Sequence, residues 1–250
     1  MLGDQQGPRL TSDRSPANPH ERVPPAARIV ALLEVLICSD YPTQIALAST
    51  FSAAGFPPKL SLDYVVTLSL LDTALLVVLI GVFLYAHGER PRDVLAGGRP
   101  IGPEIKAGQP MTLVALAIGI GVLVAVKLLA PSLHNVPHNP LEELIRGPRD
   151  ALAFAVVVVV ARAVREEIQR GFVLHRFDVW LGGGMVGVVV GSVAFGAGHL
   201  LQGIDAAIAT GLLGAFWGVV YLRRRSVIAP MVSHSGFNLL EIAQYLAGGG

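Results

Sequence analysis

The amino-acid sequence predicts an all-α protein, a polytopic transmembrane helical bundle with about seven spanning helices. Of its 250 residues, 52% are hydrophobic and only 15% are charged, whereas about a quarter of a typical soluble domain is charged. The mean hydropathy is correspondingly high, at +0.59. A chain of this composition has too little polar surface to cover itself in water, so we expect an integral membrane protein. Its single cysteine, Cys38, excludes an intrachain disulfide scaffold.

Seven apolar runs follow the N-terminal segment, and a spanning helix needs about 20 such residues. The runs are too long and too continuously apolar for the alternating strands of a membrane barrel. Asp40 and Pro42 interrupt the first run, which is still counted as a span. The runs cover residues 28–53, 62–86, 111–130, 151–177, 185–201, 204–222 and 226–247.

Residues 1–27 differ from the rest, because prolines lie among polar residues and almost nothing can be buried. We predict a disordered N-terminal tail over 1–27 and a transmembrane helical domain over 28–250, without a signal peptide. Most basic residues lie in segments that are inside if the N-terminus is cytoplasmic. The excess of arginine over lysine is typical of a bacterial chain, so we expect the inner (plasma) membrane. A net charge of +1 gives no reason to expect nucleic acid as a partner.

The first cluster of ionisable residues interrupts the run at 151–177, where Glu166 and Glu167 lie between apolar segments. A charge at the centre of a membrane helix costs about 2.5–3.5 kcal/mol, so it needs a partner or a function. If the helix is continuous, Glu166 and Arg170 lie one turn apart and can pair, while Glu167 points about 100° away. The alternative is that the helix ends at Val164 and a solvated inner loop follows.

Two further clusters place polar residues in later apolar runs. The second cluster, Phe195 to His199, ends a run whose glycines would let a neighbouring helix approach closely. These glycines are Gly187, Gly191, Gly196 and Gly198. The third cluster places His234 and Asn238 one turn apart on one helix face, where they could donate to an oxyanion or link two helices. Together, the three clusters supply the minimum set of groups for hydrolysis.

These three clusters, in this order, resemble the motifs of the CAAX prenyl protease and bacteriocin-processing family of intramembrane proteases, also called the Abi family. The family pattern is Glu-Glu-x-x-x-Arg, then Phe-x-x-x-His, then His-x-x-x-Asn or Asp. Phe195 with His199 and His234 with Asn238 match the second and third motifs in full. The resemblance covers about residues 145–245, which we take as the catalytic core.

The resemblance implies an intramembrane endopeptidase of the CAAX protease type. Its partners would be a peptide or membrane-protein substrate and the lipid bilayer. A glutamate of the first motif, Glu166 or Glu167, would activate water together with His199. His234 and Asn238 would then stabilise the oxyanion of the tetrahedral intermediate.

The resemblance also implies two supporting residues and leaves the cofactor open. Arg170 would pair with a motif carboxylate, and Phe195 belongs to the second motif. Members are commonly labelled metalloproteases, yet a glutamate-activated water without zinc is also a proposed mechanism. A Zn²⁺ ion would use Glu166, His199 and His234 as ligands, although their spacing is not that of His-Glu-x-x-His.

The first motif departs from the family pattern, because only two residues separate the acidic pair from Arg170. Registration on Arg170 makes Glu166 the second glutamate and puts Arg165 in the place of the catalytic first one. Registration on the acidic pair makes Glu166 the catalytic residue instead. The first registration favours a non-catalytic membrane scaffold or bacteriocin-immunity protein of the same fold, and a proton-relay transporter is a third reading. Asp40 and Asp72 also interrupt apolar runs and could line the same cavity, but the sequence assigns them no role.

Overall fold

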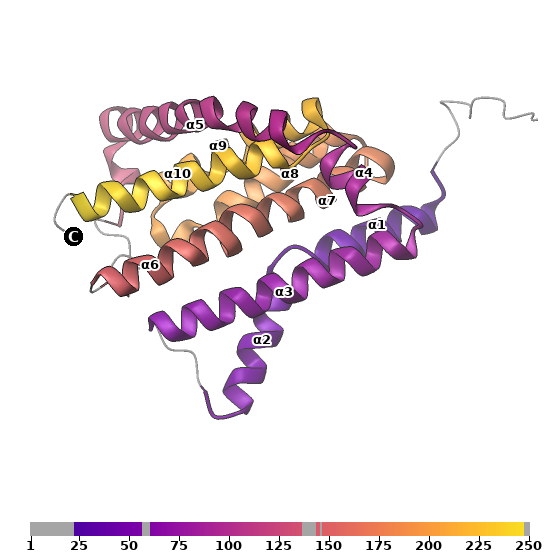
Figure 1. Ribbon diagram of the computed structural model, residues 1–250, viewed down its shortest axis with the longest axis horizontal. Coiled ribbons are helices and arrows are strands. Elements are labelled where there is room, and N and C mark those ends of the chain that lie inside the picture. The colour runs from indigo at the N-terminus through magenta and orange to yellow at the C-terminus, as the bar shows by residue number, and fades with distance from the viewer. Residues whose placement is uncertain (1–22, 57–60, 137–143, 146, 248–250) are drawn as a thin grey trace, which may run out of the picture.

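The computed structural model describes residues 23–56, 61–136, 144–145 and 147–247. All regular elements in this part of the chain are helical (Figure 1). The prediction of an all-α fold is therefore confirmed for these residues. Most of the predicted N-terminal tail, residues 1–27, lies outside them, and the first helix begins at Pro25.

The α-helices of the described ranges match the predicted apolar runs closely. They are α1 (Pro25–Ile37), α2 (Tyr41–Ala53), α3 (Leu62–Ala86), α4 (Pro91–Ala96), α5 (Ile101–Leu129), α6 (Pro148–Val157), α7 (Arg165–Trp180), α8 (Gly184–Ala197), α9 (Ile204–Arg224) and α10 (Ile228–Ala247). A π-helical segment, Val158–Val164, joins α6 directly to α7. The largest difference from the predicted bounds is at α5, which begins at Ile101 and contains Pro110 in its interior.

Fewer of these helices than expected are long and apolar enough to cross a membrane. α3, α5 and α9 satisfy both conditions, and α1 with α2 adds a fourth if this pair, bent by 47°, is one broken span. The predicted count of about seven spans is not confirmed. α8 has only 14 residues, and the helix from α6 through α7 carries the charged cluster that contains Glu166. The apolar helices nevertheless make the chain an integral membrane protein.

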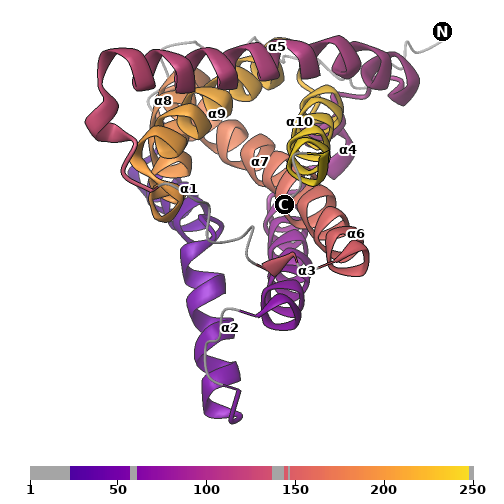
Figure 2. The same ribbon diagram turned by 90° about the vertical axis from the view of Figure 1, so that its left-hand side faces the viewer.

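The helix from α6 through α7 runs through the middle of the molecule, and other helices pack on two sides of it (Figures 1 and 2). α1, α2 and α3 lie on one side, while α5, α9 and α10 lie on the other. α8 packs against both α7 and α9, and α10 packs against the π-helical segment. The three motif clusters come together for this reason.

Glycines allow the closest contacts between helices on the α5–α9–α10 side. A Cβ at Gly196 of α8 would lie 2.6 Å from the carbonyl oxygen of Ala207 on α9. A Cβ at Gly108 of α5 would lie 2.6 Å from both the Ala229 oxygen and the Val232 Cβ on α10. Side chains would hold these backbones apart, so small residues are required for packing in lipid. The predicted close approach of a neighbouring helix is confirmed at Gly196.

A separate charged cluster lies further along α7, around the fully buried Arg176. Its Nε donates to Glu34 Oε2 at 2.6 Å, and its Nη1 donates to Glu89 Oε2 at 2.6 Å. His87 contacts Glu34 at 2.8 Å, and His175 contacts Glu89 at 2.6 Å. Burial raises the pKa of Glu89, but hydrogen bonds from His175 and Arg176 outweigh it and hold the pKa below the ordinary 4.5. The cluster ties α1 and the turn after α3 to α7.

Candidate active site

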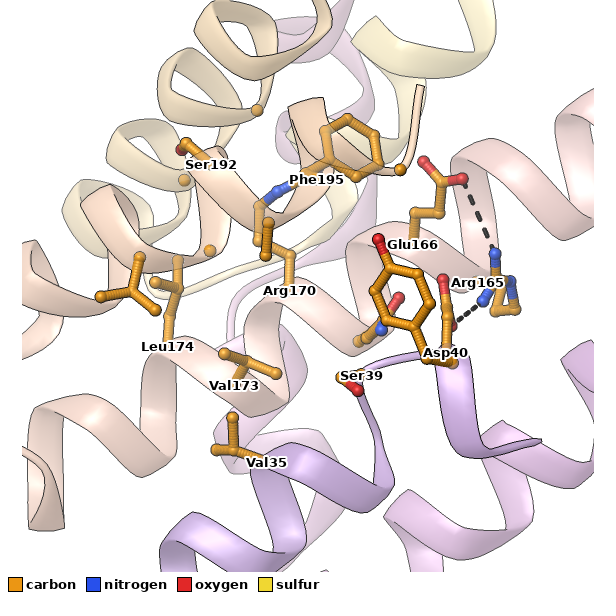
Figure 3. Close-up of a pocket in the computed structure, with 18 of the residues that line it drawn as sticks. Val35, Ser39, Asp40, Arg165, Glu166, Arg170, Val173, Leu174, Ser192 and Phe195 are labelled. Carbon is orange, nitrogen blue, oxygen red and sulfur yellow. Dashed lines mark hydrogen bonds and ion pairs between the residues drawn. The ribbon is translucent and has the colours of Figure 1, made fainter. Parts of the chain in front are cut away.

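A cavity of about 320 Å³ lies between the α1–α2 break, α3, α7 and α8 (Figure 3). Asp40, Arg165 and Glu166 lie at one end of it, which is polar. Val35 and Val173 lie at the other end, which is apolar. Polar chemistry and an apolar substrate segment can therefore meet in this space.

The structure brings the first and second motifs together at this cavity. The motif residues that line it are Glu166, Arg170, Phe195 and His199. Glu166 lies inside α7 and is only 4% exposed, so the alternative of a solvated loop after Val164 is wrong. The other predicted site residues are Glu167, His234 and Asn238, which do not line the cavity. On α10, His234 contacts Glu167 of α7, and Asn238 contacts the π-helical segment.

The Glu166 carboxylate has three ionisable neighbours, and all of them lie beyond hydrogen-bond distance. Its Oε1 lies 3.8 Å from Arg162 Nη1 and 3.7 Å from Arg165 Nη2. Its Oε2 lies 3.9 Å from His234 Nε2. N–H···O bonds rarely exceed about 3.2 Å, so these are longer ion-pair contacts. The oxygens of Glu166 therefore remain available to accept a hydrogen bond from water.

His199 presents an unprotonated nitrogen to the same cavity. Its Nδ1 lies 2.8 Å from the backbone oxygen of Phe195, and because a carbonyl only accepts, Nδ1 carries the hydrogen. The Nε2 of the neutral ring is then an acceptor, and it lies 3.3 Å from a donor, Arg162 Nη1. The Phe195 ring also packs edge to face on the imidazole, with 4.9 Å between centroids. The second motif thus fixes both the tautomer and the orientation of His199.

Arg170 pairs with Glu167 and not with Glu166, which corrects the pairing predicted from the four-residue spacing. Residues three and four apart on a helix are both neighbours, so the spacing alone allowed either partner. Aromatic rings on two other helices determine which of the two glutamates Arg170 binds. The Arg170 guanidinium lies over Phe195 at 4.9 Å and over Trp217 at 5.7 Å, on the side of α7 where Glu167 is buried.

His234 is held by Glu167 and by an aromatic ring. Its Nδ1 lies 2.9 Å from Glu167 Oε1, so Nδ1 carries the hydrogen and Nε2 remains on the side of Glu166. The imidazole stacks on Trp217 at 3.9 Å between centroids, and Trp217 Nε1 donates to Ser233 Oγ at 3.1 Å. Glu167 therefore anchors its neighbours, while Glu166 alone of the pair reaches the cavity. This division of roles favours registration of the first motif on the acidic pair.

Asn238 lies one turn from His234 on α10, as predicted, and contacts the π-helical segment. Its Nδ2 donates to the Val158 carbonyl oxygen at 3.4 Å. Arg165 Nε donates to another carbonyl of this segment, that of Ala161, at 2.7 Å. π-Helical turns are rare and frequently occur at functional sites. Here two side chains of the site bind its carbonyl oxygens and fix the residues that lead into Glu166.

Residues 148–240, from α6 into α10, match the family model described as type II CAAX prenyl endopeptidase Rce1-like. This part of the chain is similar to that family and is called the Rce1-like domain from here on. The match contains all three motifs and confirms the resemblance to CAAX proteases predicted from the sequence. The family is one of proteases, so the domain supports a peptidase. No curated protein and no solved structure matches the chain.

The Rce1-like domain does not fit the zinc site that the sequence left open. Within the described ranges, no group of three or more His, Cys, Asp or Glu side chains is arranged to hold a metal ion. Glu166, His199 and His234 therefore do not form a ligand set. His199 Nε2 faces a guanidinium, and His234 Nδ1 is bound to Glu167. A metalloprotease is not supported by this arrangement.

Three charged residues of the site lie outside the motifs of the Rce1-like domain. Asp40 and Asp72 line the cavity from the N-terminal half, and Arg162 lines it from the π-helical segment. The sequence suggested a shared cavity for Asp40 and Asp72, and it showed Arg162 only as a charge within an apolar run. Such a charge signals a partner or a function but does not identify the partner.

Proposed function

We propose that the protein is an intramembrane endopeptidase in which Glu166 and His199 activate the water molecule that attacks a peptide carbonyl. One observation carries the proposal. A carboxylate on α7 and an unprotonated imidazole nitrogen after α8 line the same cavity. The carboxylate oxygens are free to accept from water, and water reaches the imidazole nitrogen by displacing Arg162. The Rce1-like domain supports a peptidase in general, and general-base catalysis needs such acceptors within reach of one water.

The proposed reaction moves one proton and exchanges two bonds. Water donates one hydrogen bond to Glu166 and the other to His199 Nε2, where it replaces Arg162 Nη1. As the water oxygen bonds to the carbonyl carbon, one of these acceptors takes the proton. The proton then passes to the nitrogen of the scissile bond, which breaks to release an amine, while the carboxylic acid product keeps the water oxygen. No further reactant is needed.

His234 and Asn238 are the proposed donors to the oxyanion. Because Nδ1–H of His234 is bound to Glu167, the resting ring is neutral and donates from Nε2 only after it takes up a proton during the reaction, when the carboxylates of Glu166 and Glu167 lie beside it to balance the charge. Asn238 has two amide hydrogens and gives one to Val158, which leaves the second. Donors placed in this way are typically worth about 10²- to 10³-fold in rate.

The non-catalytic alternative, a membrane scaffold or immunity protein, was motivated by Arg165 at the possible place of a catalytic glutamate. In the structure Arg165 binds Asp40, and Glu166 keeps its place in the cavity. The reason for preferring a non-catalytic protein is therefore weaker than the sequence suggested. The charged groups also pair locally, which does not favour a proton relay across the membrane.

The substrate and location follow from the shape and charge of the molecule. The apolar end of the cavity suits a peptide or membrane-protein segment with apolar side chains. Exposed arginines gather where α4 meets the end of α9, among them Arg90, Arg92, Arg223 and Arg225. We place this end in the cytoplasm of a bacterial cell, with the protein in the inner membrane and its N-terminus cytoplasmic.

Cleavage of quenched-fluorescence peptides by the full-length protein in lipid nanodiscs tests the proposed function. The library contains apolar and prenylated members, and the matched blank is the double variant Glu166→Gln/His199→Ala with its thermal unfolding measured in parallel. We expect the wild type to release fluorescent products and the double variant to release none. Equal cleavage by the two proteins would contradict the proposed function, because it would come from a contaminant or another site.

The open space beside Gly191 predicts a change of selectivity. Gly191 lines the cavity, and a Cβ there would meet no heavy atom within 4 Å, unlike the Cβ at Gly196. Gly191→Leu should therefore fold normally and lower kcat/KM for peptides with bulky residues about tenfold more than for peptides with small ones. Gly196→Leu, the matched control, should lose stability instead. Equal loss for bulky and small peptides in Gly191→Leu would show that the substrate does not occupy this space.

A further inference from the structure

Arg165, the residue before the proposed base, is bound more closely by two aspartates than by Glu166. Its Nη1 forms an ion pair with Asp40 and lies 3.4 Å from Asp72 Oδ2. Its Nη2 lies 3.7 Å from Glu166 Oε1, beyond hydrogen-bond distance (Figure 3). Both aspartates come from the N-terminal half, outside the Rce1-like domain. The negative charges that neutralise Arg165 thus come from the α1–α2 break and from α3, which contain none of the three motifs.

The two aspartates occupy unusual positions. Asp40 lies in the break between α1 and α2 with a φ of 76°, in the left-handed region that few residues other than glycine adopt. Asp72 lies within α3, is 2% exposed, and its Oδ1 has no hydrogen-bond partner among the described residues. A strained backbone and an unpartnered buried oxygen are both costly, and such features are concentrated at functional sites.

The charges around Glu166 do not cancel. Three carboxylates, those of Asp40, Asp72 and Glu166, share the two guanidiniums of Arg162 and Arg165. One carboxylate is therefore left without full compensation. The two aspartates contact Arg165 at shorter distances than Glu166 does, so they take up most of the charge of Arg165, and Glu166 is left mainly with its 3.8 Å contact with Arg162.

The remaining ionisable groups near Glu166 leave this balance unchanged. Glu167 and Arg170 form an ion pair and neutralise each other. The hydrogen bonds of His199 are those of a neutral ring. His234 lies 3.9 Å from Glu166 but is hydrogen-bonded to Glu167, which is its closer carboxylate.

We propose that Asp40 and Asp72 are positioning residues that hold the charge of Arg165, so that Glu166 stays basic enough to take a proton from water. The inference rests on the proposed function, since it concerns the same carboxylate. Removing one aspartate would leave two carboxylates against two guanidiniums. Arg165 would then stabilise the anionic form of Glu166 and weaken it as a base.

The protonation of Glu166 can be measured without a substrate. Dicyclohexylcarbodiimide adds to a protonated carboxylic acid, and peptide mass spectrometry locates the resulting N-acylurea on Glu166. Labelling is followed against pH in the full-length protein in lipid nanodiscs, for the wild type, Asp40→Asn and Asp72→Asn. We expect each substitution to lower the pH of half-labelling of Glu166 by about one unit or more. The value of kcat/KM should fall about tenfold or more.

A second substitution separates positioning from damage to the fold. Arg165→Gln removes the cation and should raise the pH of half-labelling, and the double variant Asp40→Asn/Arg165→Gln should return it toward the wild-type value. Two structural defects would add and would not cancel in this way. Asp63→Asn, the same chemical change at the exposed start of α3, is the matched control and should leave labelling and cleavage unchanged.

The outcomes distinguish this inference from the proposed function. An unchanged pH of half-labelling in Asp40→Asn would overturn the inference, even if cleavage fell. A lowered pH of half-labelling, together with equal cleavage by the wild type and Glu166→Gln/His199→Ala, would overturn the proposed function and leave the charge arrangement standing.

Discussion

Replacing Glu166 by glutamine is expected to lower kcat/KM for peptide cleavage by about 10²- to 10⁴-fold, the usual contribution of a general base. Glutamine has the same shape but cannot accept a proton from water. The structural cost should be small, because the contacts of Glu166 with Arg162, Arg165 and His234 are 3.7 to 3.9 Å long. The free energy of unfolding should therefore change little while turnover is lost. Steady-state kinetics and thermal unfolding in the same nanodiscs measure both quantities.

Glu167→Gln is the matched control, because it makes the same chemical change at the next residue. It removes the charge that binds Arg170 and His234, so we expect it to lower the thermal unfolding temperature more than Glu166→Gln does. Any loss of activity should accompany this loss of stability. The opposite pattern, with full activity in Glu166→Gln and an inactive but stable Glu167→Gln, would identify Glu167 as the base. It would also contradict registration of the motif on the acidic pair.

The partner of Arg170, Glu166 or Glu167, could not be decided from residue spacing within one helix. Helical spacing predicted that Glu166 pairs with Arg170, and this is wrong, because Arg170 pairs with Glu167. The spacing allowed both Glu166 and Glu167, and the structure selects Glu167 through Phe195 and Trp217, which belong to other helices. Hydrophobic periodicity is a property of one helix, so it cannot contain this information.

The helices themselves were more predictable than the membrane spans. Apolar runs mark helices because lipid requires every backbone group to be paired within its segment, and the run at 62–86 coincides with α3. The span count is different, since it depends on which helices are long, uncharged and exposed to lipid. The run at 151–177 is helical but carries charges from Arg162 to Arg170, of which Arg165, Glu166 and Glu167 are buried. The run at 185–201 contains a helix of only 14 residues.

For the N-terminal half of the site, the sequence suggested that Asp40 and Asp72 line one cavity, but it did not identify the residue that they bind. Asp40 is 125 residues away from its partner Arg165, and the sequence shows only that an aspartate interrupts an apolar run. Asp72 gives the same signal. A buried charge requires compensation, which predicts a partner for each aspartate but not its identity. The packing of α1 and α3 against α7 supplies that identity.

Replacing Arg176 by methionine is expected to cost about 3–5 kcal/mol of the free energy of unfolding, the largest stability effect in the molecule outside the site. Arg176 is fully buried, and methionine fills similar volume without charge. Glu34 and Glu89 would then face each other without their shared cation, although His87 and His175 would remain beside them. Denaturant titration of the wild type and the variant in mixed micelles measures the loss of free energy of unfolding.

The same substitution at an exposed ion pair is the control. Arg225 pairs with Asp178 at 2.6 Å, but its side chain is 52% exposed, so Arg225→Met should cost less than about 1 kcal/mol. An equal cost for the two variants would show that the cluster around Arg176 does not stabilise the fold.

The pH dependence of the Arg176→Met variant should have the opposite sign to that of the wild type. Glu89 has a lowered pKa in the folded wild type, so its stabilising contribution is fully present above pH 4.5 and is lost as the pH falls through that lowered pKa. The wild type should therefore lose stability on acidification in this range. In the variant, protonation of Glu34 or Glu89 removes an uncompensated charge, so acidification from neutral pH should recover part of the lost stability. Parallel curves for the two proteins would contradict the assignment of Arg176 as the cation that makes these two carboxylates tolerable inside the fold.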